Sequence, residues 1–132
     1  MEFKSLQQRE LTLRILLQIK DAILDLKEWN KDIPSMDELL KSSEGMQKLA
    51  GNCMLIQAIG EGFKQVDKRT EGQLLPLRSD IPWRQVIGMR DRISHGYFEI
   101  DTDYIDDVLD NDLDLLLPAV EDLIRICEEV GE

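Results

Sequence analysis

Apolar residues recur at helical spacing along most of this 132-residue chain, and that pattern is the strongest constraint on its fold. In the first thirty residues they stand at Ile15, Ile19, Ile23 and Leu26, which lie on one face of a helix. No segment alternates apolar and polar residues in the way that is typical of a half-buried strand. The sequence therefore predicts an all-α fold.

Cap and turn signals divide the pattern into four or five helices. Pro34 ends the first helix, Ser35 and Glu38 form a capping-box signature for the second, and residues 70–81 lose the periodicity. Pro118 should kink or restart the last helix. These signals predict an antiparallel up-and-down bundle in a single domain over residues 1–132. The expected helices cover residues 6–31, Ser35 to about Lys68, Pro82 to about His95, an element capped by Asp101, and Leu113 to Cys127.

Glycine and tryptophan positions indicate where helices meet. Gly51, Gly60 and Gly62 each weaken the second helix by up to about 1 kcal/mol relative to alanine, so we expect close packing against a neighbouring helix there. Trp29 and Trp83 lie on apolar stripes, which favours a place in the core or in a dimer interface over a role in stacking on nucleic-acid bases.

Chain length and cysteine content set the expected environment. A chain of this size buries enough surface to fold without a disulfide or a metal ion. Its two cysteines, Cys53 and Cys127, match no metal-ligand spacing and favour a reducing cytoplasm. We expect no membrane span and no signal peptide, because no apolar run is long enough and Met1 begins no apolar leader. A cytoplasmic protein with neither metal nor cofactor is therefore expected.

Acidic charge is confined to the C-terminal part of the chain. The net charge is −11, and residues 99–132 contain 13 acidic residues but a single basic one, Arg125. A solvated helix face is the simplest interpretation of such a run, and a docking surface for a basic protein is the alternative. Because an acidic protein repels phosphate, any nucleic-acid site must be local.

The third helix carries the residues with the clearest chemistry. Arg90 occupies a stripe position that calls for an apolar residue, and His95 is the only histidine. Arginine binds phosphate and histidine transfers protons near neutral pH, so the pair suits phosphodiester cleavage without a metal ion. Five residues on a helix span about 140°, so the two side chains converge only if the helix end distorts or a second subunit contributes. A helix-ending histidine, with Arg90 paired to Asp91 or another carboxylate, is equally open.

The segment Arg90-Asp91-Arg92-Ile93-Ser94-His95-Gly96-Tyr97, with its preceding Ile-Pro-Trp-Arg entry, resembles the signature of HepT-like proteins of the HEPN superfamily. Ile59-Gly60-Glu61 upstream and Asp110-Asn111-Asp112-Leu113 downstream resemble the same family, so the likeness runs from about residue 8 to 126. HepT-like proteins are helical, metal-independent ribonucleases, and they are the toxins of toxin–antitoxin pairs. They dimerise so that two motifs line one cleft.

This resemblance implies a role for each motif residue. Arg90 and His95 become the catalytic pair acting on an RNA substrate, and Asp91 occupies the supporting polar position, where the family often has asparagine. Tyr97 matches the tyrosine that a minimal nucleotidyltransferase, the antitoxin, modifies with AMP. A homodimer supplies two copies of His95, one as base and one as acid. Arg84 and Arg92 extend the positive charge or remain ordinary surface arginines.

A second interpretation comes from a different class of protein. In it the chain is a non-catalytic regulatory partner of a nucleotidyltransferase, and Arg90 and His95 bind a nucleotide or a phosphate without cleaving it. The joint presence of Arg90, His95 and Tyr97 favours the ribonuclease, because a pure scaffold needs none of the three.

Overall fold

The computed structural model describes residues 1–93 and 99–130, and this part of the chain is helical without a β-strand. The all-α prediction is confirmed for these residues. Three long helices form the frame, α1 (Leu6–Asn30), α2 (Ser43–Arg69) and α6 (Leu113–Val130). Short helices join them: η1 (Met36–Lys41), η2 (Leu75–Arg78), α3 (Trp83–Ile87), α4 (Met89–Arg92), α5 (Thr102–Asp107) and the π-helical η3 (Val108–Asp112).

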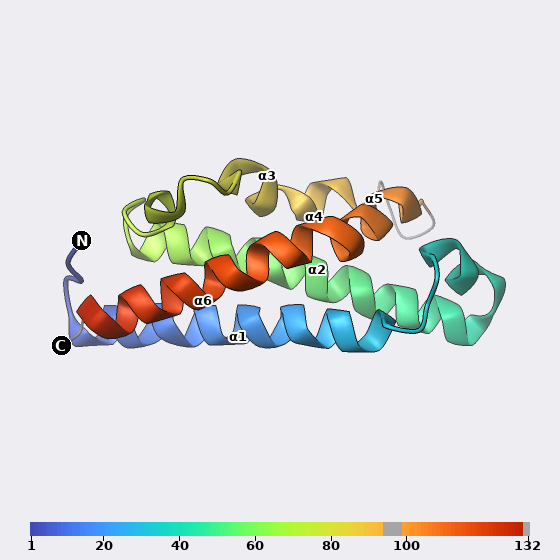
Figure 1. The fold of residues 1–132 in the computed structure, drawn as a ribbon, viewed down its shortest axis with the longest axis horizontal. Coiled ribbons are helices and arrows are strands. Elements are labelled where there is room, and N and C mark those ends of the chain that lie inside the picture. Colours follow the sequence, from blue (N-terminus) through green and yellow to red (C-terminus); the bar gives the residue numbers. More distant parts are fainter. Residues whose placement is uncertain (94–98, 131–132) are drawn as a thin grey trace.

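The helices alternate in direction along an elongated molecule (Figure 1). In that view α1 runs from left to right, α2 returns, α3 and α4 lead back along α2, and α6 returns across the front. This is the order of an up-and-down bundle, with two short helices in place of its third long one. The buried apolar residues form one cluster that reaches from Leu16 on α1 to Cys127 on α6.

The second long helix begins later than the capping-box signature predicts. The Ser35 side chain makes no capping hydrogen bond, and the residues after it form the 3₁₀ helix η1. Helix α2 starts at Ser43, where the hydroxyl of Ser42 accepts from the backbone N–H of Gly45 at 2.9 Å. Tertiary packing decides the difference, because η1 buries Met36 and Leu39 against the core.

Of the three glycines for which close packing was predicted, Gly60 and Gly62 pack closely against their neighbours, whereas Gly51 makes only an ordinary contact with Trp29. A Cβ atom at Gly60 would lie 3.2 Å from the carbonyl oxygens of Val86 and Ile87 on α3. At Gly62 it would lie 2.8 Å from the side chain of Ile19 on α1. Glycine at these positions therefore sets how near α1 and α3 approach α2.

The prediction of one continuous third helix over residues 82–95 is wrong, because Gly88 divides this segment into α3 and α4. Gly88 has a ψ of −1°, and its N–H donates to the carbonyl of Arg84 at 3.1 Å. The buried face runs through Val86, Met89 and Ile93, whereas Arg90 is exposed. The stripe through Trp83, Val86 and Ile87 thus stops before Arg90.

Pro118 does not restart the last helix, a restart being one of the two outcomes predicted for it, and α6 continues through it. Proline lacks the N–H that would bond to the carbonyl of Asp114, four residues earlier. Both residues are exposed, so water can satisfy that carbonyl. The inner face of α6 also buries seven residues, including Leu116 and Leu123, which holds the helix against the core. Of the neighbouring signals, the predicted Asp101 cap is confirmed, since its carboxylate accepts from the N–H of Tyr104 at 3.0 Å.

Candidate functional site

Arg90 projects from α4 into solvent and pairs with two carboxylates. Its Nη1 lies 3.4 Å from Oε2 of Glu61 on α2, and its Nε lies 3.6 Å from Oδ1 of Asp91. The Arg90 side chain is 56% exposed. It is therefore exposed, whereas its position on the predicted stripe indicated partial desolvation.

These ion pairs are the ones that a structural role for Arg90 predicts, but they leave it open to an anion. Exposed ion pairs contribute about 0 to 1 kcal/mol, so a phosphate displaces Glu61 or Asp91 from the guanidinium at little cost. The side chain of Asp91, 81% exposed, adds negative charge beside Arg90. Sequence spacing could not have identified Glu61 as the partner of Arg90, since it lies on another helix; only the resemblance drew attention to it.

His95 and Tyr97, the other predicted site residues, lie outside the described residues. The chain on either side of them is described, and the N–H of Asp101 donates to the carbonyl of Ile93 at 2.7 Å. The residues that follow the motif thus return to the end of α4, which carries Arg90.

Arg92 points to the side of α4 away from Arg90. Its guanidinium carbon lies 4.4 Å from the centre of the Tyr104 ring on α5, a distance typical of a cation–π contact. Partial burial raises the pKa of Tyr104, and Arg92 opposes that shift. The sequence analysis named Arg92 but not Tyr104, whose contact with it depends on how α5 packs beside α4.

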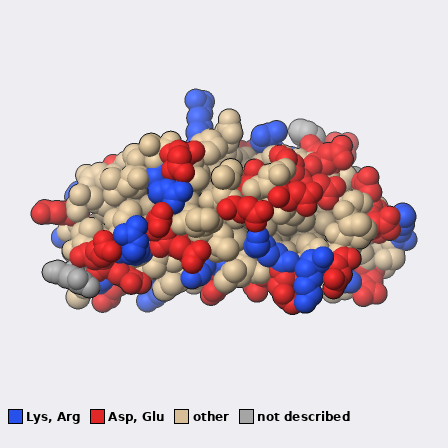
Figure 2. Space-filling view, in the orientation of Figure 1, with Lys and Arg blue, Asp and Glu red and all other residues tan. Residues whose placement is uncertain are grey.

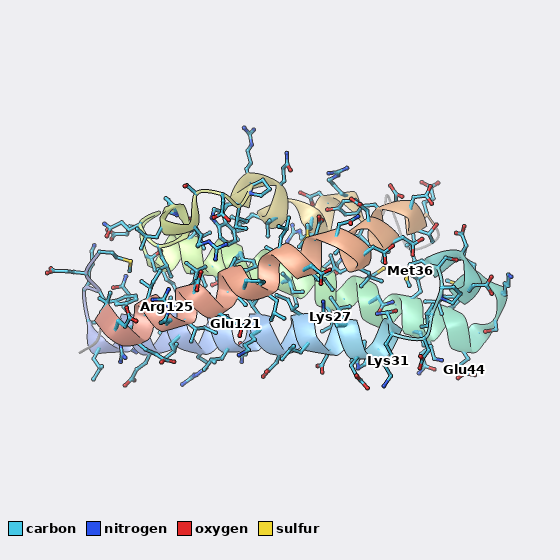
Figure 3. All side chains as sticks on the ribbon, in the orientation of Figure 1. Lys27, Lys31, Met36, Glu44, Glu121 and Arg125 are labelled. Carbon is cyan, nitrogen blue, oxygen red and sulfur yellow. The ribbon has the colours of Figure 1, made fainter. Side chains whose placement is uncertain are left out.

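The lysines of α1 are neutralised by α6. Lys27 pairs with Asp114, and Lys20 lies 3.6 Å from Glu121; Lys27 and Glu121 are labelled in Figure 3. Arg125 is likewise held on α6, where it pairs with Asp122 and Glu129, and it is labelled as well. Lys20 and Lys27 therefore join α1 to α6, whereas the pairs of Arg125 lie within α6.

Three exposed cations near Arg90 have no carboxylate partner in the described part of the chain. Lys64 and Lys68 lie one and two turns beyond Glu61 on α2, and Arg84 is on α3, which packs against α2 at Gly60. With Arg90 they lie along the α2–α3 side, which also carries Glu61 and Asp67, and we call this surface the α2–α3 strip. Unlike the α1 lysines, these three side chains have no ion pair in the described part of the chain that a phosphate must displace.

The acidic C-terminal part forms a separate surface. Figure 2 shows red atoms gathered over α5 and the beginning of α6. Most of these carboxylates are exposed, which agrees with a solvated helix face. Two are partly buried, and burial raises the pKa values of Asp106 and Asp112 above the usual range of aspartate.

The two tryptophans have different environments. Trp83 packs against Phe63, with ring centres 4.9 Å apart, and its Nε1 donates to the carbonyls of Leu75 and Arg78. It therefore belongs to the packing of α3, as predicted. Trp29 is 50% exposed on α1 and is not a core residue.

Both cysteines are free thiols, and burial raises their pKa values, that of Cys127 to about 11. No three His, Cys, Asp or Glu side chains in residues 1–93 and 99–130 are placed to hold a metal ion. Within the same ranges, no helix is long and apolar enough to cross a membrane.

Comparison with known proteins assigns the family. A family profile described as Ribonuclease HepT-like matches residues 19–130, and the chain belongs to this family. It is also 23% identical, over 117 residues, to a protein of Methanocaldococcus jannaschii whose name marks it as a candidate RNase. The matched region covers 89% of this chain and 90% of that protein. No solved structure matches the chain significantly.

Proposed function

We propose that this protein is a metal-independent ribonuclease in which Arg90 binds the scissile phosphate and His95 transfers protons. The observation that carries the proposal is the family match across α1 to α6, together with an exposed Arg90 at the start of the motif. The α2–α3 strip supports it, because unpaired cations beside Arg90 extend the surface that an RNA backbone can contact.

The reaction needs a base, an acid and a positive group at phosphorus. A homodimer brings two copies of His95 together, since each chain has a single histidine. One copy removes the proton of the 2′-hydroxyl, whose oxygen attacks phosphorus. The other copy gives its proton to the departing 5′-oxygen while Arg90 holds the phosphate. The products are a 2′,3′-cyclic phosphate and a 5′-hydroxyl end.

We further propose that the protein acts as a toxin in the cytoplasm and that Tyr97 is its control point. A partner nucleotidyltransferase, the antitoxin, would transfer AMP from a nucleoside triphosphate to the Tyr97 oxygen and release pyrophosphate. The added phosphate carries negative charge next to the motif, where it competes with RNA for Arg90. The phenol of Tyr97 follows His95 by two residues, so modification and catalysis share one segment.

The test compares growth of a bacterial host on induction of the wild type, Arg90→Ala and His95→Ala. Arg14→Ala is the matched control, because Arg14 is an exposed arginine on the opposite helix α1. Circular dichroism confirms that all four fold. We expect the wild type and the control to arrest growth and to produce RNA fragments with cyclic-phosphate ends, and both motif variants to do neither.

Equal behaviour of all four proteins would contradict the ribonuclease proposal. It would favour the second candidate, a nucleotide-binding regulatory partner of a nucleotidyltransferase. Sedimentation tests the dimer separately: a monomeric variant with full activity would rule out a shared site.

A further inference from the structure

A small hollow lies on the Arg92 side of α4, between that helix and the α5–η3–α6 segment. Its volume is about 130 Å³, compared with about 300 to 1,000 Å³ for sites that enclose drug-sized ligands. Such a hollow can hold one flat ring system but not a whole nucleotide. Its apolar wall is made by Ile81, Val86, Met89 and Leu116.

The rim of the hollow combines one cation, one aromatic ring and two carboxylates. Arg92 and Tyr104 form the cation–π pair described above, and Asp107 and Asp112 stand on the facing segment. Asp107 already accepts from the amide of Asn111 at 2.7 Å. Asp112 receives no hydrogen bond from another described side chain, and it is half-buried. Burial, and then the charge of Asp107, raise its pKa, whereas the charge of Arg92 lowers it. A hydrogen-bond donor in the hollow would stabilise the charged form of Asp112.

Among the four RNA bases, guanine fits this rim best. Its N1–H and N2–H₂ groups are adjacent donors on one edge, and they match the two oxygens of a carboxylate. Its O6 and N7 acceptors suit an arginine. Adenine and cytosine place a ring acceptor beside their amino group, which would face a carboxylate lone pair, and uracil has one N–H between two carbonyls.

We propose that this hollow binds a guanine base of the RNA substrate, with Asp112 accepting from N1–H and N2–H₂ and Arg92 lying beside O6 and N7. The apolar wall covers one face of the base. The inference rests on the proposed ribonuclease function, to which it adds a base preference next to the cleavage site.

The hollow and Arg90 lie on different sides of α4. Two residues on a helix differ by about 200°, so Arg90 faces α2 and Glu61 whereas Arg92 faces α5 and Tyr104. An RNA strand with one base in the hollow brings a neighbouring phosphate to Arg90 by passing around the end of α4. That end is where the hydrogen bond from Asp101 to Ile93 brings the chain back after the motif.

The test measures binding of guanosine, adenosine, cytidine and uridine 5′-monophosphates by calorimetry, with guanosine added to separate base from phosphate binding. The variant is Asp112→Asn, and Asp110→Asn is the matched control, since Asp110 lies on the same η3 turn but does not line the hollow. Thermal unfolding confirms that both variants fold. We expect wild type and control to favour the guanine ligands by roughly tenfold or more, and Asp112→Asn to lose that preference.

Equal binding of the four nucleotides, no binding at all, or an unchanged preference in Asp112→Asn would overturn the proposal. Cleavage of RNA oligomers that contain one guanosine each separates it from the proposed function. Cleavage that ignores guanosine leaves the ribonuclease intact and overturns the base site. Guanine-selective binding without any cleavage keeps the base site but contradicts the ribonuclease, and it favours the nucleotide-binding partner instead.

Discussion

Replacing Gly60 with alanine is expected to lower the stability of this protein, although alanine is the better helix former. A Cβ atom at Gly60 would lie 3.2 Å from the carbonyl oxygens of Val86 and Ile87, which are backbone atoms of α3 and cannot rotate away. Gly51 on the same helix is the matched control. Its added Cβ would lie 3.5 Å from the ring of Trp29, an ordinary contact.

The two substitutions share their helix-propensity gain and differ in packing. Glycine to alanine favours a helix interior by about 1 kcal/mol. Nothing opposes that gain at Gly51, so Gly51→Ala should be more stable by roughly 0.5 to 1 kcal/mol. Overpacking at Gly60 costs about 1 to 3 kcal/mol, which leaves a net loss of roughly 0 to 2 kcal/mol. The expected difference between the variants is about 1 to 3 kcal/mol.

Urea unfolding followed by circular dichroism measures this difference, and the Tm values should separate by about 2 °C or more. RNA cleavage is the second readout, because moving α3 away from α2 also moves Arg90 relative to Glu61. Equal stabilities for Gly60→Ala and Gly51→Ala would refute the argument that glycine at position 60 sets the spacing of the two helices.

Three further outcomes are expected. Burial raises the pKa of Asp112 in the folded chain above its ordinary 3.8, so the folded state loses stability as pH rises above 3.8 and through the raised pKa. Asp112→Asn should therefore raise Tm more at pH 7 than at pH 4, and Asp103→Asn is the exposed control. Because burial raises the pKa of Cys127 to about 11, its alkylation at pH 8 should be slow in the folded chain and fast in urea, which mass spectrometry can follow. Asn52→Ala should cost about 2 to 4 kcal/mol in urea unfolding, since it removes two amide hydrogen bonds with Asn30, of 2.9 and 2.8 Å, from a buried site.

Local signals account for the elements that the sequence predicted correctly. The 3.6-residue periodicity identified α1 and most of α2 and α6, because each buries one apolar face against the others. The Asp101 cap was also correct, since a capping carboxylate acts on a backbone N–H only three residues away. Such interactions are encoded within a few neighbouring residues.

The elements that were predicted wrongly depend on distant contacts. Ser35 had the residues of a capping box, but η1 forms there instead because it buries Met36 against α2. Gly88 divides a helix whose apolar residues are regularly spaced in the sequence. Pro118 was accommodated because α6 is held by its buried inner face and because water reaches the carbonyl of Asp114.

The sequence by itself determined the all-α class, the three long helices and the motif from Arg90 to Tyr97, because periodicity and motif spacing are properties of neighbouring residues. Only the tertiary structure decided that Arg90 is exposed and paired with Glu61, that Arg92 lies over Tyr104, and that Asp112 faces the same hollow. These pairs join residues on different helices. Their contacts follow from how closely the helices pack, which depends on close approaches such as that of α3 to Gly60 and is not revealed by any local pattern.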